Sequence, residues 1–356
     1  MCGLRLKHAS TVCSKTSFLE LWDFFWSDEC KFLLERLKNE GENGAMNSTS
    51  WTEFVLLGFL SQTKIATYAF AAIFLMFVIA LVGNGLLLLV IQLDSALQTP
   101  MYFFLSQLSF MDMCQVLVIV PQTTVGFVTQ KKTITLFQCA AQVFLMLNIG
   151  GAECLLLAIM SYDRYVAICR PLQYPVLMRK TICLFMSAGA WVTTFLYALI
   201  RAIYLLLLSY CGTNTMNHFM CEFPIVVKLS CSDTSFFEKV SLFFGGNLFL
   251  LFPFSVIVAS YISILLQIMK VQRLGERSNK ALVTCLPHLC VVTIFYGSAI
   301  LRHIKPLSSY PGEQVQIFSA LCTIATSTVN PFIYSLRNRD VLSALGKLFK
   351  KLKVPK

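Results

Sequence analysis

The sequence predicts an all-α membrane protein built around a bundle of seven transmembrane helices. Of its 356 residues, 56% are hydrophobic and only 13% are charged, a composition too apolar for a water-soluble domain. Seven long apolar segments follow a more polar start of the chain. Because this number of spans is odd, the two ends of the chain are expected on opposite sides of the membrane.

Each apolar segment is long enough to cross lipid as a helix. The first, residues 68–91, has 24 positions without a charge, about 36 Å of helix against a hydrocarbon core of about 30 Å. The others are residues 101–122, 137–162, 181–208, 240–269, 281–301 and 315–336. With their connections, these segments define a transmembrane domain over residues 68–338.

Basic residues are divided unequally between the two sides. From Met46 onward, the side that holds the N-terminal tail carries eight Lys or Arg residues, and the opposite side carries fifteen. The positive-inside rule therefore predicts an extracellular N-terminal tail, residues 46–67, and a cytoplasmic C-terminus at the plasma membrane. Asn47 begins an N-x-S/T sequon in that tail and is the expected N-glycosylation site.

The two ends of the chain differ from the membrane domain. Residues 1–45 are mixed in charge and lack an apolar run suited to a signal peptide, so we expect an atypical, disordered extension. Residues 339–356 place apolar residues at helical spacing among lysines, which predicts an amphipathic helix on anionic lipid, then a short tail. The net charge of +11 suits such lipid; because the basic residues are scattered singly, no nucleic-acid partner is expected.

The sequence carries none of the common enzyme motifs. It contains no H-E-x-x-H, G-x-S-x-G, Walker A or dinucleotide-binding G-x-G-x-x-G pattern, so no catalytic residue is assigned and no enzyme activity is expected. Cys285, His288 and Cys290 lie within the sixth span at a spacing unsuited to zinc. We expect these three side chains to pack in the interior, and we predict no metal centre.

Four polar side chains fall near the middle of the spans. Asn84, Asp112, Glu153 and Asn330 are expected to face the bundle interior, because a charge at mid-bilayer costs about 2.5 to 3.5 kcal/mol. Two carboxylates and two amides suit a hydrated sodium ion, and no other cofactor is expected. An ion-free hydrogen-bonded network is an equal alternative.

The third span presents one functional face. Met146, Gly150, Glu153 and Arg164 fall at helical spacing along about 27 Å of this face. Asp163 is the expected partner of the Arg164 guanidinium at the cytoplasmic end. The alternative is a simple anchor pair at the membrane interface.

Four cysteines fall on the predicted extracellular side: Cys139, Cys211, Cys221 and Cys231. An oxidising compartment favours their pairing. Their positions alone leave all three connectivities open.

Several longer strings resemble one family. Asp163-Arg164-Tyr165 at the end of the third span resembles rhodopsin-like G-protein-coupled receptors. The strings PMYFFLSQLSFMD (100–112), MSYDRYVAICRPLQY (160–174), KALVTCLPHL with FYG (280–297) and NPFIYSLRN (330–338) together resemble an odorant receptor over about residues 46–353. Members usually begin near the equivalent of Met46 and have Ser at the position of Pro287, a proline expected to kink the sixth span.

The resemblance implies a receptor for small volatile molecules that bind between spans three, five, six and seven. The matching positions are Met146, Leu147, Gly150, Gly151, Phe249, Tyr296, Ala299, Ile300 and His303. Most are apolar, which suits a small uncharged odorant, and Met146 stands where amine-binding relatives have an acid. Gly150 and Gly151 are expected either to leave room for a bulkier ligand or to allow close helix approach.

The resemblance also implies disulfides Cys139–Cys221 and Cys211–Cys231, and a heterotrimeric G protein of the stimulatory, olfactory type as partner. The implied switch residues are Asp163, Arg164, Tyr165, Tyr261 and Tyr334. A receptor of this fold acting as a chemosensor outside the nose is one alternative. An ion-coupled transporter or channel using Asp112 and Glu153 is another, which the absence of an internal repeat disfavours.

Overall fold

The structure is a computed structural model that describes residues 52–57, 64–129, 133–211, 213–216, 218–273, 279–304, 312–337 and 339–353. The expected extension of residues 1–45 and the sequon asparagine Asn47 lie outside these ranges.

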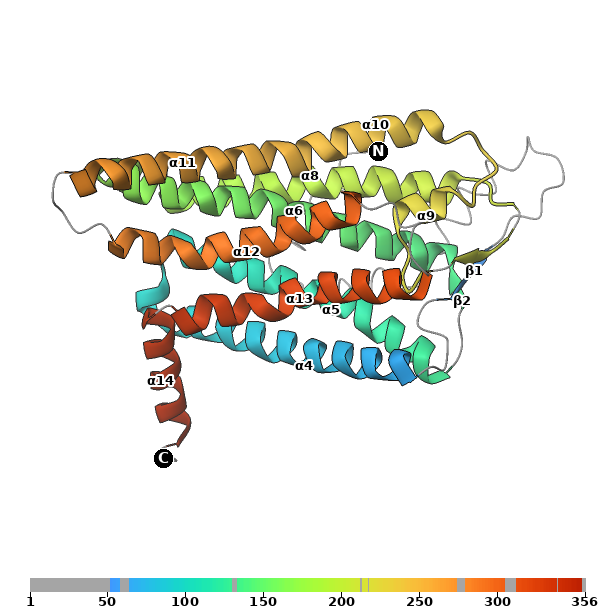
Figure 1. The fold of residues 1–356 in the computed structure, drawn as a ribbon, viewed down its shortest axis with the longest axis horizontal. Coiled ribbons are helices and arrows are strands. Elements are labelled where there is room, and N and C mark those ends of the chain that lie inside the picture. The colour runs from blue at the N-terminus through green and yellow to red at the C-terminus, as the bar shows by residue number, and fades with distance from the viewer. Residues whose placement is uncertain are drawn as a thin grey trace, which may run out of the picture.

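Long helices run side by side and form the bundle (Figure 1). They are α4 (Lys64–Leu93), α5 (Pro100–Thr129), α6 (Leu136–Cys169), α8 (Lys180–Leu207), the segment α10 (Ser235–Gly245), η4 (Gly246–Leu251) and α11 (Phe252–Arg273), then α12 (Asn279–Ile304) and α13 (Gly312–Arg337). Within the described residues, α4, α5, α6, α8 and the α10–α11 segment are long and apolar enough to cross a membrane. The seven apolar segments thus correspond to the helices of the bundle.

The local sequence explains where these helices begin and how they continue. Thr135 caps α6, since its hydroxyl accepts from the Gln138 amide while the Gln138 side chain accepts from the Thr135 amide. α12 continues as one helix through Pro287, and α13 continues through Pro331. Neighbouring helices make prolines tolerable inside transmembrane helices.

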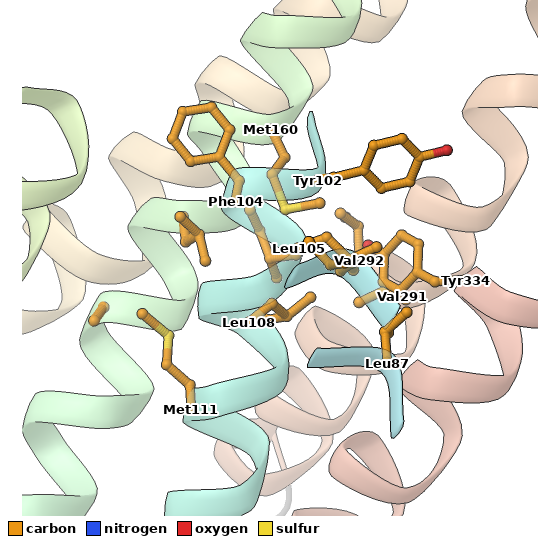
Figure 2. Close-up of a cluster of buried hydrophobic side chains, with 14 of the residues drawn as sticks. Leu87, Tyr102, Phe104, Leu105, Leu108, Met111, Met160, Val291, Val292 and Tyr334 are labelled. Carbon is orange, nitrogen blue, oxygen red and sulfur yellow. The ribbon is translucent and has the colours of Figure 1, made fainter. Parts of the chain in front are cut away.

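A continuous apolar core joins the helices. Figure 2 shows Leu108 of α5, Met160 of α6, Val291 of α12 and Tyr334 of α13 packed together. All four side chains are buried. The outer surface of the bundle is also apolar, so apolar character alone does not distinguish the inner faces of these helices from the outer ones. The inner faces differ by their dense packing against neighbouring helices.

A small three-stranded sheet lies at the opposite end of the bundle from α14 (Figure 1). Its central strand, β1 (Glu53–Leu56), pairs antiparallel with β2 (Thr133–Thr135) and parallel with β3 (Thr215–Met216). The tail before the first helix is thereby tied to two loops distant from it in sequence.

Both disulfides implied by the resemblance are present. Cys139 is bonded to Cys221, which ties the start of α6 to the segment before α9 (Phe223–Val227). Cys211 is bonded to Cys231, so this second disulfide joins the residues on the two sides of α9. The structure therefore selects one of the three pairings that the cysteine positions alone left open.

α14 (Arg339–Lys353) turns away from the bundle after α13 (Figure 1). The Lys347 ammonium group lies 2.9 Å from the Asp94 carboxylate, beside the short turn η2 (Ser95–Leu97) that connects α4 and α5. The predicted helix after the last span is therefore present, and it rests against the first connection on this side of the bundle.

Candidate functional site

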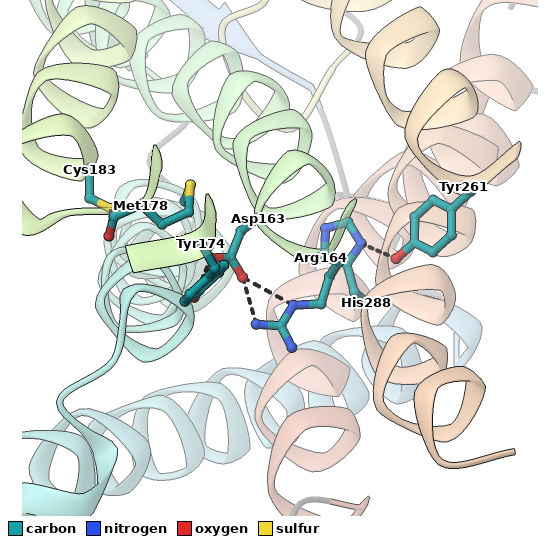
Figure 3. Close-up of polar contacts among 7 residues, drawn as sticks. All are labelled: Asp163, Arg164, Tyr174, Met178, Cys183, Tyr261 and His288. Carbon is teal, nitrogen blue, oxygen red and sulfur yellow. Dashed lines mark hydrogen bonds and ion pairs between the residues drawn. The ribbon is translucent and has the colours of Figure 1, made fainter. Parts of the chain in front are cut away.

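One end of α6 carries a buried carboxylate with two partners. The Arg164 guanidinium donates to Asp163 Oδ2, with Nε at 3.1 Å and Nη2 at 2.5 Å (Figure 3). The Tyr174 hydroxyl donates to Asp163 Oδ1 at 2.8 Å. Asp163 is fully buried, so these contacts supply the hydrogen bonds that its carboxylate would lose with water.

Tyr174 begins the short helix α7 (Tyr174–Leu177), which follows α6 through the turn η3 (Pro171–Gln173). Burial and then the adjacent Asp163 carboxylate raise the pKa of Tyr174. The hydroxyl therefore keeps its proton at physiological pH and acts as a donor. The sequence interpretation assigned no role to Tyr174, although it lies inside the string 160–174 on which the resemblance rests.

A second polar contact joins three helices near this site (Figure 3). The Tyr261 hydroxyl of α11 lies 2.7 Å from Nδ1 of His288 in α12, and His288 Nε2 lies 3.1 Å from the Leu157 carbonyl of α6. A carbonyl only accepts, so Nε2 carries the proton and Nδ1 accepts from Tyr261. His288 is fully buried as expected, but it is also a hydrogen-bonded link rather than simple packing.

The four central polar residues do not form one closed network. Asn330 Nδ2 donates to both carboxylate oxygens of Asp112, at 3.1 and 2.9 Å, while Asn84 Nδ2 donates to the carbonyls of Ala80 and Ser327. Both oxygens of Glu153 and the Oδ1 atom of Asn84 lack a hydrogen-bond partner in the described part of the chain.

Carboxylate and amide oxygens are ligands that suit a hard cation such as sodium, so the chemistry of these residues is compatible with a bound ion. The described ranges contain no group of three or more His, Cys, Asp or Glu side chains placed to hold a metal. Any ion here would therefore depend on amide oxygens and water as well as carboxylates.

The two adjacent glycines of α6 have different surroundings. A Cβ atom at Gly151 would lie 2.9 Å from Thr194 Cγ2 and 3.5 Å from Phe249 Cδ1, whereas one at Gly150 would have no neighbour within 4 Å. The sequence left two interpretations open for both positions. In the structure each glycine fits a different one of these interpretations: Gly151 allows close approach of α6 and α8, while Gly150 faces open space.

The remaining predicted ligand positions are placed unequally. Phe249 and Tyr296 are buried, and Met146 and Leu147 are partly buried on α6. Ala299, Ile300 and His303 belong to α12, but their side chains lie outside the described part of the structure. Their role in ligand binding stays a prediction.

Two loop residues that the sequence interpretation missed lie beside Met146. Phe219 and Met220, next to the disulfide residue Cys221, are buried in an apolar cluster with residues of α4, α5 and α13, and Met146 packs against that cluster. Gln142 of α6 fixes this loop by accepting from the Cys221 amide at 2.8 Å. A disulfide that draws the loop onto the bundle was the only sequence signal for this arrangement.

Comparison with known proteins agrees with this architecture. Residues 73–352 match the family described as olfactory receptor. The chain is 41% identical over 305 residues to human olfactory receptor 2M5, covering 86% of this chain and 97% of that protein. It is 43% identical to human olfactory receptor 2T11 over 304 residues and 42% identical to mouse olfactory receptor 2V1 over 302 residues. These matches cover 85% of this chain and 96% and 95% of those relatives, respectively.

The match runs from within α4 through the last helix of the bundle, and the identity extends over nearly the whole length of each relative. The protein is therefore a multi-pass membrane protein with the seven-helix fold, and its chain belongs to the olfactory receptor family.

Proposed function

We propose that this protein is an odorant receptor that binds small, mostly apolar volatile molecules inside the bundle and activates a stimulatory, olfactory-type G protein, raising cyclic AMP. Membership of the family supports the receptor function. The apolar character of Met146, Leu147 and Phe249, together with open space at Gly150, supports a ligand of this chemistry.

The observation that carries the coupling mechanism is the contact between Arg164 and Asp163. In this resting arrangement the guanidinium is held on its own helix by the neighbouring carboxylate. Agonist binding favours a conformation in which the end of α12 near this pair is displaced, Arg164 leaves Asp163, and a cavity opens for the G-protein α-subunit. Tyr261, on α11 beside α6, and Tyr334, on α13 beside α12, would steady the open form.

The same proposal places the sheet end of the bundle outside the cell and α14 in the cytoplasm. Two observations support this orientation. Lysines and arginines are more numerous in the segments on the α14 side. Both disulfides lie at the sheet end, and disulfides persist in oxidising compartments. Lipid contacts of the lysines in α14 follow from this orientation.

A sodium ion between α5, α6 and α4 remains part of the proposal. It would be held by Glu153 and Asn84 oxygens near Asp112, and would supply positive charge that stabilises the resting bundle. An ion-free network is the alternative, and replacing external sodium with N-methylglucamine in a functional assay separates the two.

The test of the coupling mechanism uses the full chain in cells that contain the olfactory G protein, an odorant panel and a cyclic AMP reporter. Arg164→Ala should abolish the odorant response at equal surface level, because the group that reaches the G protein is gone. Normal signalling by this variant would contradict the switch. Odorant-gated current in cells without the G protein would instead favour a channel.

A further inference from the structure

Two side chains of a loop are buried inside the bundle beside the expected odorant positions. Phe219 and Met220, the loop pair, belong to neither a helix nor a strand, yet their side chains are only 4% and 3% exposed. They pack in an apolar cluster with residues of α4, α5 and α13. Loops usually run over the surface of a protein, so this inward placement is unusual.

Three contacts fix the position of this loop along α6. Cys221, the residue after the loop pair, is bonded to Cys139, and its amide donates to the Gln142 side chain at 2.8 Å. The Gln142 side-chain amide donates in turn to the Val118 carbonyl of α5 at 3.3 Å. The loop pair is therefore held by covalent and hydrogen bonds to α6 and, through Gln142, to α5, in addition to its apolar contacts.

The loop pair lies on the sheet side of the expected odorant positions. α6 follows β2 directly, so Gly150, Met146 and Gln142 succeed one another toward the sheet at intervals of four residues. Gly150 and Gln142 are about 12 Å apart along the helix axis. Met146, between them, packs both against the cluster that contains the loop pair and against the core cluster that contains Tyr296. A ligand in the open space at Gly150 that extends along Met146 toward the sheet therefore meets the loop pair.

We propose that the loop pair closes the odorant site on the sheet side and sets the longest ligand that the site admits. Its two apolar side chains fill the space between α4, α5 and α13 into which the hydrocarbon tail of a longer ligand would extend. A closely packed interior has few voids, and forcing extra methylene groups into one is costly. This inference rests on the proposed odorant-receptor function and deepens it, because it names residues that select ligands by length.

The test measures the response as a function of ligand length. The full chain is expressed in cells with a cyclic AMP reporter, and half-maximal concentrations are measured at equal surface level. The probes are unbranched aliphatic alcohols and aldehydes, from the butyl to the dodecyl member, and any other agonist from the odorant panel extended by carbons at its apolar end. In the native receptor, potency should rise about fourfold for each added carbon that is buried, then fall sharply at a cut-off length.

Truncation of the loop pair should move this cut-off. Phe219→Ala and Met220→Ala each remove side-chain volume from the wall, so the cut-off should shift to ligands longer by about two to four carbons. Short members should lose potency, because they no longer fill the site. Phe219→Leu removes less volume and costs less stability, so it tests the same wall in a receptor closer to the native one; it should shift the cut-off by about one carbon.

Phe223→Ala is the matched control. Phe223 lies two residues after Cys221 and is also 4% exposed, but it belongs to a different apolar cluster, and its ring centre lies 3.8 Å from the guanidinium carbon of Arg201. This variant also loses a buried aromatic ring next to the disulfide. It should leave the cut-off length unchanged in the receptor that reaches the surface.

The outcomes separate this inference from the function beneath it. An unchanged cut-off in Phe219→Leu and Met220→Ala, or a native receptor without any cut-off, would overturn the inference and leave the odorant receptor intact. An equal shift in Phe223→Ala would also overturn it, because general loosening of the loop would then explain the result. A receptor at the cell surface that answers no odorant would contradict the proposed function, and the inference with it.

Discussion

Tyr174 donates a hydrogen bond to the Oδ1 atom of Asp163, the carboxylate oxygen that the Arg164 guanidinium leaves free. The buried carboxylate is thus held on both oxygens, by its sequence neighbour on one and by the following short helix on the other. The segment after α6 therefore takes part in positioning Arg164, through the carboxylate that both side chains contact.

Loss of the Tyr174 hydroxyl should loosen this arrangement. Tyr174→Phe removes one hydrogen bond to a carboxylate, worth about 1.5 to 3 kcal/mol at most, and leaves the ring in place. Part of that cost destabilises the proposed resting conformation relative to the active one. We therefore expect the basal level of cyclic AMP to rise about two- to fivefold. The measurement is the reporter signal without odorant, normalised to surface receptor.

Tyr162→Phe is the matched control for this change, because it removes a hydroxyl from the same end of α6 without touching Asp163. Its basal signal should equal that of the native receptor. A Tyr174→Phe receptor with unchanged basal signal would show that Arg164 alone determines the resting state of Asp163.

The two glycines of α6 should respond differently to alanine. In Gly151→Ala the new methyl group would lie 2.9 Å from Thr194 Cγ2, and Thr194 cannot move freely because its hydroxyl bonds Asn148 at 2.8 Å. Overpacking of this kind costs about 1 to 3 kcal/mol, so the melting temperature of the purified receptor should fall. Gly150→Ala should melt like the native protein.

A second substitution tests the cause. Thr194→Ser removes the Cγ2 methyl and keeps the hydroxyl, so it should restore most of the stability lost in Gly151→Ala. If Thr194→Ser gives no recovery, the loss does not come from this contact.

Sequence patterns predicted the spans well but not their ends. The first span was expected at residues 68–91 and the helix extends over Lys64–Leu93; the second was expected to end at 122 and continues to Thr129. Apolar runs report the hydrocarbon core, while a helix continues through the polar interface where charged residues are tolerated. The fifth span begins at Ser235 rather than 240 for the same reason.

Apart from the two disulfides that the family resemblance implied, contacts between distant segments could not be predicted from the sequence. The strands β1, β2 and β3 have only four, three and two residues, too few to give an alternating pattern. The roles of Tyr174 and His288 depend on which helix lies beside which. The cost of an unpaired histidine inside a membrane span was nevertheless a usable signal that His288 needed a partner.

Tyr261 and His288 should contribute jointly to stability. Tyr261→Phe and His288→Leu each break the 2.7 Å contact, and His288→Leu also removes the side-chain hydrogen bond to the Leu157 carbonyl. Because the two changes remove the same hydrogen bond, the double variant should be about 1 to 2 kcal/mol more stable than the sum of the single losses predicts. Thermal denaturation of the purified native receptor, the two single variants and the double variant measures these stability losses. Strict additivity would show that the contact contributes nothing.

Phe54 should anchor the tail to the sheet end of the bundle. Its side chain is fully buried and lies edge-to-face against Tyr210, with ring centroids 5.1 Å apart, in a cluster that includes the disulfide residues Cys139 and Cys221. Phe54→Ala removes a buried aromatic ring, a change that costs about 3 to 5 kcal/mol in protein cores. A marginally stable membrane protein with such a loss is retained inside the cell, so labelling of the receptor at the cell surface should fall severalfold.

Glu53→Ala is the control, because Glu53 is the exposed neighbour of Phe54 in the same strand. This variant keeps the backbone pairing and should reach the surface normally. Equal surface levels for both variants would mean that the strand's backbone hydrogen bonds, and not the Phe54 ring, hold the tail in place.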